Sequence, residues 1–206
     1  GNKIATLPDV FALADSYDAG VRYNIETKVE AEHPEMSAPP GQFVDVILAA
    51  VRTAGKTDMV EIQSFDWRTL PMVRVAAPSV PLVALYDETT WVPGSPWLNG
   101  IDPAVVADPI VGAAMVGADI ISPGYSVPYG QTPADHGFTL VADRAYIDRA
   151  HAMGIKVIPW TINDAAVMND QIDAGADGII TDYPTRLRSV MAARGMPLPP
   201  AYHRAG

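Results

Sequence analysis

An amide, a carboxylate and an ammonium group alternate with other side chains in residues 24–28, Asn-Ile-Glu-Thr-Lys. The valine- and isoleucine-containing residues 21–26 predict a β-strand. Side chains two positions apart on a strand point to the same face, so Asn24, Glu26 and Lys28 should lie together. The carboxylate could ligate a hard cation, and the ammonium group could hold a phosphate oxygen. On spacing alone a salt bridge, buried or at the rim of a sheet, is the simpler interpretation.

The rest of the chain alternates short apolar segments with amphipathic ones. Strands are predicted at residues 21–26, 59–65, 81–86, 118–122, 155–160 and 178–181. Helices are predicted from residue 7, with Thr6 as N-cap, and at 42–54, 140–153, 163–174 and 185–194. This alternation predicts an α/β fold with a parallel sheet. Two architectures stay open, a doubly wound sheet and a (β/α) barrel. No Gly-x-Gly-x-x-Gly follows a strand, so a dinucleotide-binding sheet has no support.

Polar and aromatic residues stand where the predicted strands end. In a barrel, active-site residues are found at these positions in the sequence. The residues at the predicted strand ends are Glu26 and Lys28, then Gln63, Phe65 and Trp67, then Trp160 and Asn163, then Thr181 and Asp182. Three long connections also follow strands, at residues 29–41, 87–102 and 123–138. The second contains Trp91 and Trp97, and the third contains Tyr125 and Tyr129. Long loops with such aromatic content favour a functional role.

Composition limits the class of protein. The 206 residues are 49% hydrophobic, and no low-complexity linker divides them, so one domain over residues 1–206 is predicted. The formal charge of −10 argues against binding to nucleic acid or to an anionic membrane surface. No apolar run is long enough to span a membrane. Because cysteine is absent, thiol catalysis and zinc–thiolate sites are excluded.

Four segments, in order, resemble motifs of the glycerophosphodiester phosphodiesterases. Residues 23–28 (YNIETK) match an Asn-Ile-Glu-x-Lys strand, and residues 62–67 (IQSFDW) match a Gln-Ser-Phe-Asp-Trp strand. Residues 157–163 (VIPWTIN) and 178–184 (GIITDYP) match the last two, and residues 6–10 (TLPDV) resemble the helix before the first. The resemblance runs through essentially the whole chain. It implies a TIM-type (β/α)8 barrel, of which about six of the eight strands would be present here.

The resemblance also implies an activity and its residues. The activity is metal-dependent hydrolysis of a glycerophosphodiester to glycerol 3-phosphate and an alcohol, with one calcium or magnesium ion. Glu26 would be a metal ligand, and Lys28 would contact the substrate phosphate. Gln63, Phe65 and Trp160 would line the substrate pocket. A buried amide and ordinary core packing remain alternatives for these last three. Asp182 is expected to cap the last helix.

The family's early His-Arg-Gly strand, its Glu-x-Asp strand and its His-Asp pair are not found in this sequence. Its histidines, His33, His136, His151 and His203, stand in other contexts. We therefore expect no catalytic residue in this chain and a histidine pair upstream of it. The chain alone should be inactive. A missing N-terminal segment or a homodimer mate would be its partner.

Two alternatives to this phosphodiesterase stay open. The chain could be a truncated or degenerate barrel that binds a phosphate ligand or a partner without catalysis. It could also be an unrelated α/β sugar or phosphate enzyme with chance motifs, in which case Glu26 and Trp160 would lie far apart. The Gln-Ser-Phe-Asp-Trp segment and the proline-rich loops look more like exported bacterial members than cytosolic ones. A periplasmic or secreted protein is therefore expected, and a cytoplasmic one stays open.

Overall fold

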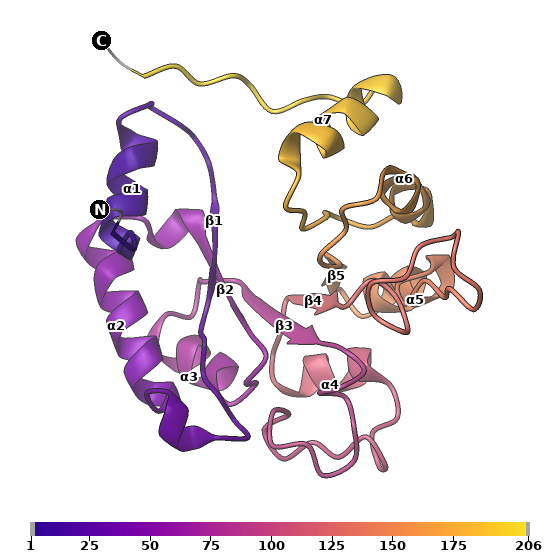
Figure 1. Cartoon of the computed structure of the whole chain (residues 1–206). Helices are drawn as coiled ribbons and strands as arrows, with labels where there is room; N and C mark the ends of the chain where they lie inside the picture. Colours follow the sequence, from indigo (N-terminus) through magenta and orange to yellow (C-terminus); the bar gives the residue numbers. More distant parts are fainter. Residues whose placement is uncertain (1–2, 205–206) are drawn as a thin grey trace.

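A computed structural model describes residues 3–204 (Figure 1). Its sheet contains β1 (Tyr23–Glu26), β2 (Val60–Ser64), β3 (Leu82–Tyr86), β4 (Ile120–Pro123) and β5 (Lys156–Val157). Its α-helices are α1 (Leu7–Asp15), α2 (Pro40–Thr53), α3 (Thr69–Ala76), α4 (Pro109–Met115), α5 (Arg144–Ala152), α6 (Ala165–Ala174) and α7 (Pro184–Ala193). Short 3-10 turns, Pro34–Met36 and Thr57–Met59, precede α2 and β2. None of the helices in this described part is long and apolar enough to cross a lipid bilayer.

The strands are all parallel and follow one another across the sheet in chain order. Right-handed crossovers between successive neighbours place every connecting helix on the same side of the sheet. In Figure 1, helices α2 to α5 accordingly lie around the outside of the curved row of strands. A doubly wound sheet would need a reversal of strand order and helices on both faces. The observed order therefore matches the winding of a barrel and not the doubly wound alternative.

Five of the six predicted strands are present, and all five are shorter than predicted. The prediction of a strand at residues 178–181 is wrong. That segment still runs beside the end of β5, because Ile180 N–H donates to Pro159 O at 3.0 Å and Ile162 N–H donates to Ile180 O at 2.9 Å. Pro159 has no N–H to donate, so the pairing does not become a regular ladder.

Side-chain caps set the beginnings of several helices. Thr6 caps α1 as predicted: its Oγ1 accepts from Asp9 N–H at 3.4 Å, and the Asp9 carboxylate accepts from Thr6 N–H at 2.8 Å. The Asp164 side chain caps α6 by accepting from Ala166 and Val167 N–H. The helix predicted at residues 140–153 begins late, because the Asp143 side chain accepts an N–H from its first turn. A capped start excludes the residues before it from the helix.

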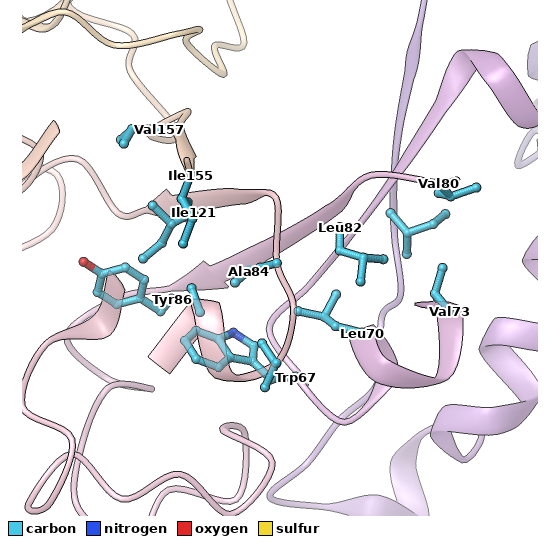
Figure 2. Packing of buried hydrophobic residues seen from close by; sticks show 14 of the residues in the cluster. Trp67, Leu70, Val73, Val80, Leu82, Ala84, Tyr86, Ile121, Ile155 and Val157 are labelled. Carbon is cyan, nitrogen blue, oxygen red and sulfur yellow. The ribbon is translucent and has the colours of Figure 1, made fainter. Parts of the chain in front are cut away.

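Helices α3 and α4 were not predicted from the sequence. They have only eight and seven residues, too few to show a clear helical period. Packing stabilises α3, which buries Leu70 and Val73 completely against the sheet. Figure 2 shows Leu70 beside Leu82 of β3, with Trp67 on its other side, and Val73 near Val80. Tertiary contacts, and not local periodicity, therefore define this helix.

Arg74 of α3 fastens together the amino-terminal ends of β3 and β4. Its Nη1 donates to Pro78 O at 2.7 Å, and its Nη2 donates to Gly117 O at 3.1 Å and to Asp119 Oδ2 at 2.6 Å. The same Asp119 oxygen accepts from Leu82 N–H at 2.8 Å. Hydrogen bonds to charged groups are the stronger ones in proteins. This guanidinium therefore acts as a clasp at the end of the sheet where the strands begin.

Replacing Ile62 should test the contribution of the core. Ile62 of β2 is fully buried, so Ile62→Ala should lower the free energy of unfolding by about 2–5 kcal/mol. Val75 on α3 is 85% exposed, so Val75→Ala should change stability by less than about 0.5 kcal/mol. Urea unfolding followed by circular dichroism measures both. Equal losses in the two variants would contradict this core.

Candidate functional site

The three polar side chains predicted to share one face of β1 do share it, and they meet a fourth from β2. Asn24 Nδ2 donates to Gln63 Oε1 at 2.8 Å, and Gln63 Nε2 donates to Glu26 Oε2 at 3.4 Å. Lys28 Nζ lies 2.8 Å from Glu26 Oε1. The parallel register pairs Glu26 directly with Gln63. Four polar groups are therefore joined in one row at the carboxyl ends of the first two strands.

The Glu26–Lys28 contact is the salt bridge that spacing allowed, but it leaves the lysine accessible. The Glu26 side chain is 18% exposed and the Lys28 side chain is 75% exposed. An ammonium group has three hydrogen-bond donors, and the contact with Glu26 engages one of them. Lys28 can therefore hold an anion from solvent while it stays beside Glu26.

Buried hydroxyl groups fasten the strand ends that carry these residues. Thr27 Oγ1 donates to Ser64 Oγ at 2.6 Å, and Ser64 Oγ donates to Asp66 O at 2.9 Å. Thr69 Oγ1 also donates to Asp66 O at 2.9 Å and lies 3.3 Å from Thr27 Oγ1. Satisfied buried hydroxyl networks make a region rigid. This one locks the β1 segment between Glu26 and Lys28 onto the end of β2.

Five aromatic rings form a continuous row beside these four polar side chains. We call this set the aromatic row; its members in order are Trp97, Phe65, Trp160, Tyr129 and Tyr125. Successive ring centroids are 6.4, 5.3, 5.1 and 5.7 Å apart. The first two contacts and the last are edge-to-face, and the third is tilted. Such geometries stabilise aromatic pairs beyond the area they bury. The row joins strand ends that are far apart in the sequence.

Hydrogen bonds to the protein hold the polar ends of the aromatic row. Trp160 Nε1 donates to Ser122 O at 2.8 Å, and Trp97 Nε1 donates to Glu32 Oε1 at 3.3 Å. The Tyr129 hydroxyl accepts a backbone N–H at 3.3 Å. The rings therefore present mainly carbon surface to a ligand. Trp97 and Tyr129 were not assigned to the site, although aromatic residues in long loops were the signal that could have found them.

The row connects two cavities at the carboxyl ends of the strands. One of about 210 Å³ is lined by Glu26, Lys28, Phe65 and Trp97. Another, of about 510 Å³, lies beside Tyr129 at the far end. These four residues come from segments that the sequence assigned to strand ends or long loops.

Phe65 and Trp160 are in direct ring contact, and Phe65 lines the smaller cavity together with Glu26. Glu26 and Trp160 thus belong to one side-chain cluster. The chance-motif alternative, which required them to be far apart, therefore loses its support.

Comparison with known families agrees with this geometry. The profile of the Glycerophosphoryl diester phosphodiesterase family matches residues 1–186. The chain belongs to this family.

Individual relatives match different shares of this chain. A probable glycerophosphodiester phosphodiesterase 2 of Mycobacterium tuberculosis is 40% identical over 65 residues, which are 32% of this chain and 25% of that protein. A glycerophosphodiester phosphodiesterase of Caldanaerobacter subterraneus is 24% identical over 95% of this chain and 65% of its own length. A crystal structure of a glycerophosphoryl diester phosphodiesterase from Silicibacter pomeroyi superposes with a TM-score of 0.70 at 24% identity. The superposition covers 92% of this chain and 57% of that one. The chain thus spans less than two thirds of these relatives.

The metal that the family resemblance implies needs more ligands than the described residues bring together. Calcium takes roughly six to eight oxygen ligands, and magnesium requires near-octahedral geometry. Glu26 offers one carboxylate, and its Oε1 faces the Lys28 ammonium group. Within residues 3–204, no three His, Cys, Asp or Glu side chains are grouped so that they could hold an ion. Glu26 fits the role of one ligand, and these residues alone do not complete a metal site.

The histidines take other roles where the structure describes their contacts. His33 Nδ1 lies 3.7 Å from Glu35 Oε1 in an exposed part of the loop after β1. His151 lies in the last turn of α5, just before β5 begins, and its Nε2 is 2.8 Å from Asp177 Oδ2, which also accepts Val157 N–H. His151 therefore lies at the opposite end of the strands from Glu26.

The expected cap by Asp182 is wrong. Helix α7 begins after Tyr183 without a side-chain cap, and Asp182 Oδ2 instead accepts from Asn163 Nδ2 at 2.8 Å. Pro184 opens the helix and has no N–H for a cap to satisfy, which removes part of the need for one. Asp182 thus fixes Asn163, one of the polar residues at the strand ends.

Thr27→Val should test the hydroxyl network, because valine keeps the shape of threonine and removes the donor. The buried Ser64 and Thr69 hydroxyls would lose a partner, so the free energy of unfolding should fall by about 1–3 kcal/mol. Thr53→Val, at an exposed position ending α2, is the matched control and should change little. Chemical denaturation of both variants gives the difference. A Thr27 variant as stable as the control would contradict the network.

Glu61 precedes Gln63 by two residues and faces the same side of β2. Burial raises the pKa of its carboxyl group above 4.5, although Arg22 and Lys156 oppose the shift. A raised folded-state pKa means that the charged form destabilises the fold above that pKa, and that the penalty disappears as the pH falls toward 4.5.

Glu61→Gln should therefore increase stability at neutral pH, and the gain should shrink as the pH is lowered through the raised pKa. Thermal unfolding across this pH range tests the prediction. Glu35→Gln, at an exposed position, should show no such trend. A loss of stability at neutral pH that shrinks on acidification would mean that the attraction to Arg22 and Lys156 outweighs the burial.

Proposed function

We propose that this chain forms part of a barrel that hydrolyses glycerophosphodiesters to glycerol 3-phosphate and an alcohol with the help of one calcium or magnesium ion. The observation that carries the proposal is the polar row Asn24–Gln63–Glu26–Lys28, which lies against the aromatic row at the carboxyl ends of parallel strands. In this class of fold, catalytic groups are built at that end of the sheet.

Each residue has a role that follows from its surroundings. The exposed Lys28 ammonium group binds a phosphate oxygen of the substrate. Glu26 supplies one carboxylate ligand to the cation, which when bound stabilises negative charge on the phosphoryl oxygens. Gln63 orients Glu26 through its Nε2 donor. Phe65 and Trp160 pack against the carbon atoms of the glycerol or alcohol part.

The proposal divides the catalytic groups between this chain and polypeptide outside it. The acid–base histidine pair and the remaining carboxylate ligands come from polypeptide outside these 206 residues, as an upstream segment or as a second chain. The chain's coverage of 57–65% of two relatives is consistent with this division. Binding of a phosphate ligand without turnover is the second candidate, favoured by the incomplete ligand set around Glu26.

Titration with sn-glycerol 3-phosphate should locate the phosphate contact. Lys28→Gln should weaken binding by about tenfold or more, because a charge-assisted hydrogen bond is lost. Lys156→Gln removes the same charge at the opposite end of the strands and should leave the affinity unchanged. Isothermal titration calorimetry measures all three proteins. Equal affinities in wild type and Lys28→Gln would rule out this contact.

A separate measurement tests whether Glu26 is a metal ligand. Magnesium or calcium should increase the affinity of the wild type for glycerol 3-phosphate, and Glu26→Gln should abolish that increase while retaining the metal-free affinity. A parallel assay of alcohol release from a glycerophosphodiester separates the two candidate functions. Release that Glu26→Gln abolishes supports hydrolysis, whereas binding without release supports the non-catalytic alternative.

A further inference from the structure

A third cavity, also of about 510 Å³, lies on the helix-covered side of the sheet, and we call it the outer pocket. It opens between the carboxyl ends of β3 and β4, the start of α4 and one face of α5. Neither Glu26, Lys28 nor Gln63 lines it. Gly124 forms part of its wall, and a Cβ there would lie 3.2 Å from Asp87 Cβ and 3.3 Å from Tyr129 Cδ2. The outer pocket therefore adjoins the aromatic row but faces the other way.

Three aromatic side chains line the outer pocket: Tyr86, Trp91 and Tyr146. Trp91 is held in place by neighbouring rings, with centroids 5.6 Å from that of Trp67 and 5.9 Å from that of Tyr86. The cavity has the size of typical small-molecule sites, which are lined mainly by apolar and aromatic groups. The fixed rings thus offer a preformed surface.

Two buried hydroxyl groups meet at this pocket. Tyr86 Oη and Tyr146 Oη lie 3.0 Å apart, and both side chains are 6% exposed. Figure 2 shows the Tyr86 hydroxyl directed away from the labelled apolar side chains of the core. Burial raises the pKa of both phenols, so both keep their protons at neutral pH. Only one proton can serve the bond between them, and the other is free for an acceptor atom.

The charges around the outer pocket select against anions. Asp87, Glu88 and Asp108 line it together with Arg149, so three carboxylates and one guanidinium leave a net charge of −2. Arg149 is partly committed, since its Nε lies 3.5 Å from Asp108 Oδ2. Its guanidinium also stands 5.6 Å from the Tyr146 ring centroid, so this wall already accommodates a cation. A phosphate or carboxylate ligand would be repelled here.

We propose that the outer pocket binds a small alkylated ammonium ion that carries a hydroxyl oxygen. The aromatic rings suit alkylated ammonium groups, which proteins recognise through ring faces. The carboxylates of Asp87 and Glu88 attract the positive charge, and the spare phenol proton pairs with the oxygen. This inference does not depend on the proposed hydrolysis, because no residue of the polar row takes part.

Choline is the probe that matches these features, and dimethylbutanol, in which carbon replaces its nitrogen, is the uncharged control of the same shape. Saturation-transfer NMR on the ligand methyl signals, with the intact chain, should show choline binding. The control should bind about tenfold more weakly or worse, because it lacks the cation–π and carboxylate attraction. Inorganic phosphate should not compete. Equal binding of the two probes, or no choline binding, would overturn the proposal.

Substitutions test whether choline binds in the outer pocket. Glu88→Gln, at an exposed position that cannot disturb the core, should weaken choline binding about threefold and leave dimethylbutanol unaffected. Trp91→Leu keeps an apolar side chain but removes the ring, so it should weaken choline about tenfold. Asp45→Asn removes a distant exposed charge on α2 and should have no effect. Losses of the same size in Asp45→Asn and Glu88→Gln would mean that net charge, and not this pocket, attracts the probe.

Discussion

The parallel register of β1 on β2 is the constraint on which the candidate site depends. With Tyr23 opposite Val60 and Glu26 opposite Gln63, apolar residues of both strands face the helices and polar ones face the other side. A slip of one residue would exchange the two faces and bury the carboxylate in the core. The Thr27–Ser64 hydrogen bond at 2.6 Å opposes that slip, because it connects the two strands just beyond their last paired residues.

The unreversed strand order extends this arrangement around the molecule. Every strand delivers its carboxyl end to the same rim, so Phe65 after β2 and Trp160 after β5 come into edge contact although 95 residues separate them. A chain with a formal charge of −10 still offers a cation at this rim, since Lys28 projects into solvent. On the opposite side of the sheet, the same winding leaves room between α4 and α5 for a pocket of the contrary charge.

Sequence reasoning succeeded where local chemistry determines the outcome. Alternation placed Asn24, Glu26 and Lys28 on one face, and strand-end positions brought Gln63, Phe65 and Trp160 to the same rim. It failed where distant contacts decide. Helix α3 depends on the burial of Leu70 and Val73, and the segment before Asp182 remains irregular because Pro159 faces it. Trp97 joins the row through its ring contact with Phe65, and its indole N–H is held by Glu32, 65 residues away, which no local pattern encodes.

The Arg74 clasp has a consequence for how such a protein can change over generations. It gathers oxygens from the turns before β3 and β4, at the end of the sheet remote from Lys28 and Trp160. The contacts that stabilise the sheet and the residues that bind a ligand thus lie at opposite ends of the same strands. Loops at the rim can lengthen, shorten or exchange aromatic residues while the clasp keeps the sheet assembled. Lineages carrying this fold are therefore free to diversify what they recognise without first surrendering the stability that makes recognition possible.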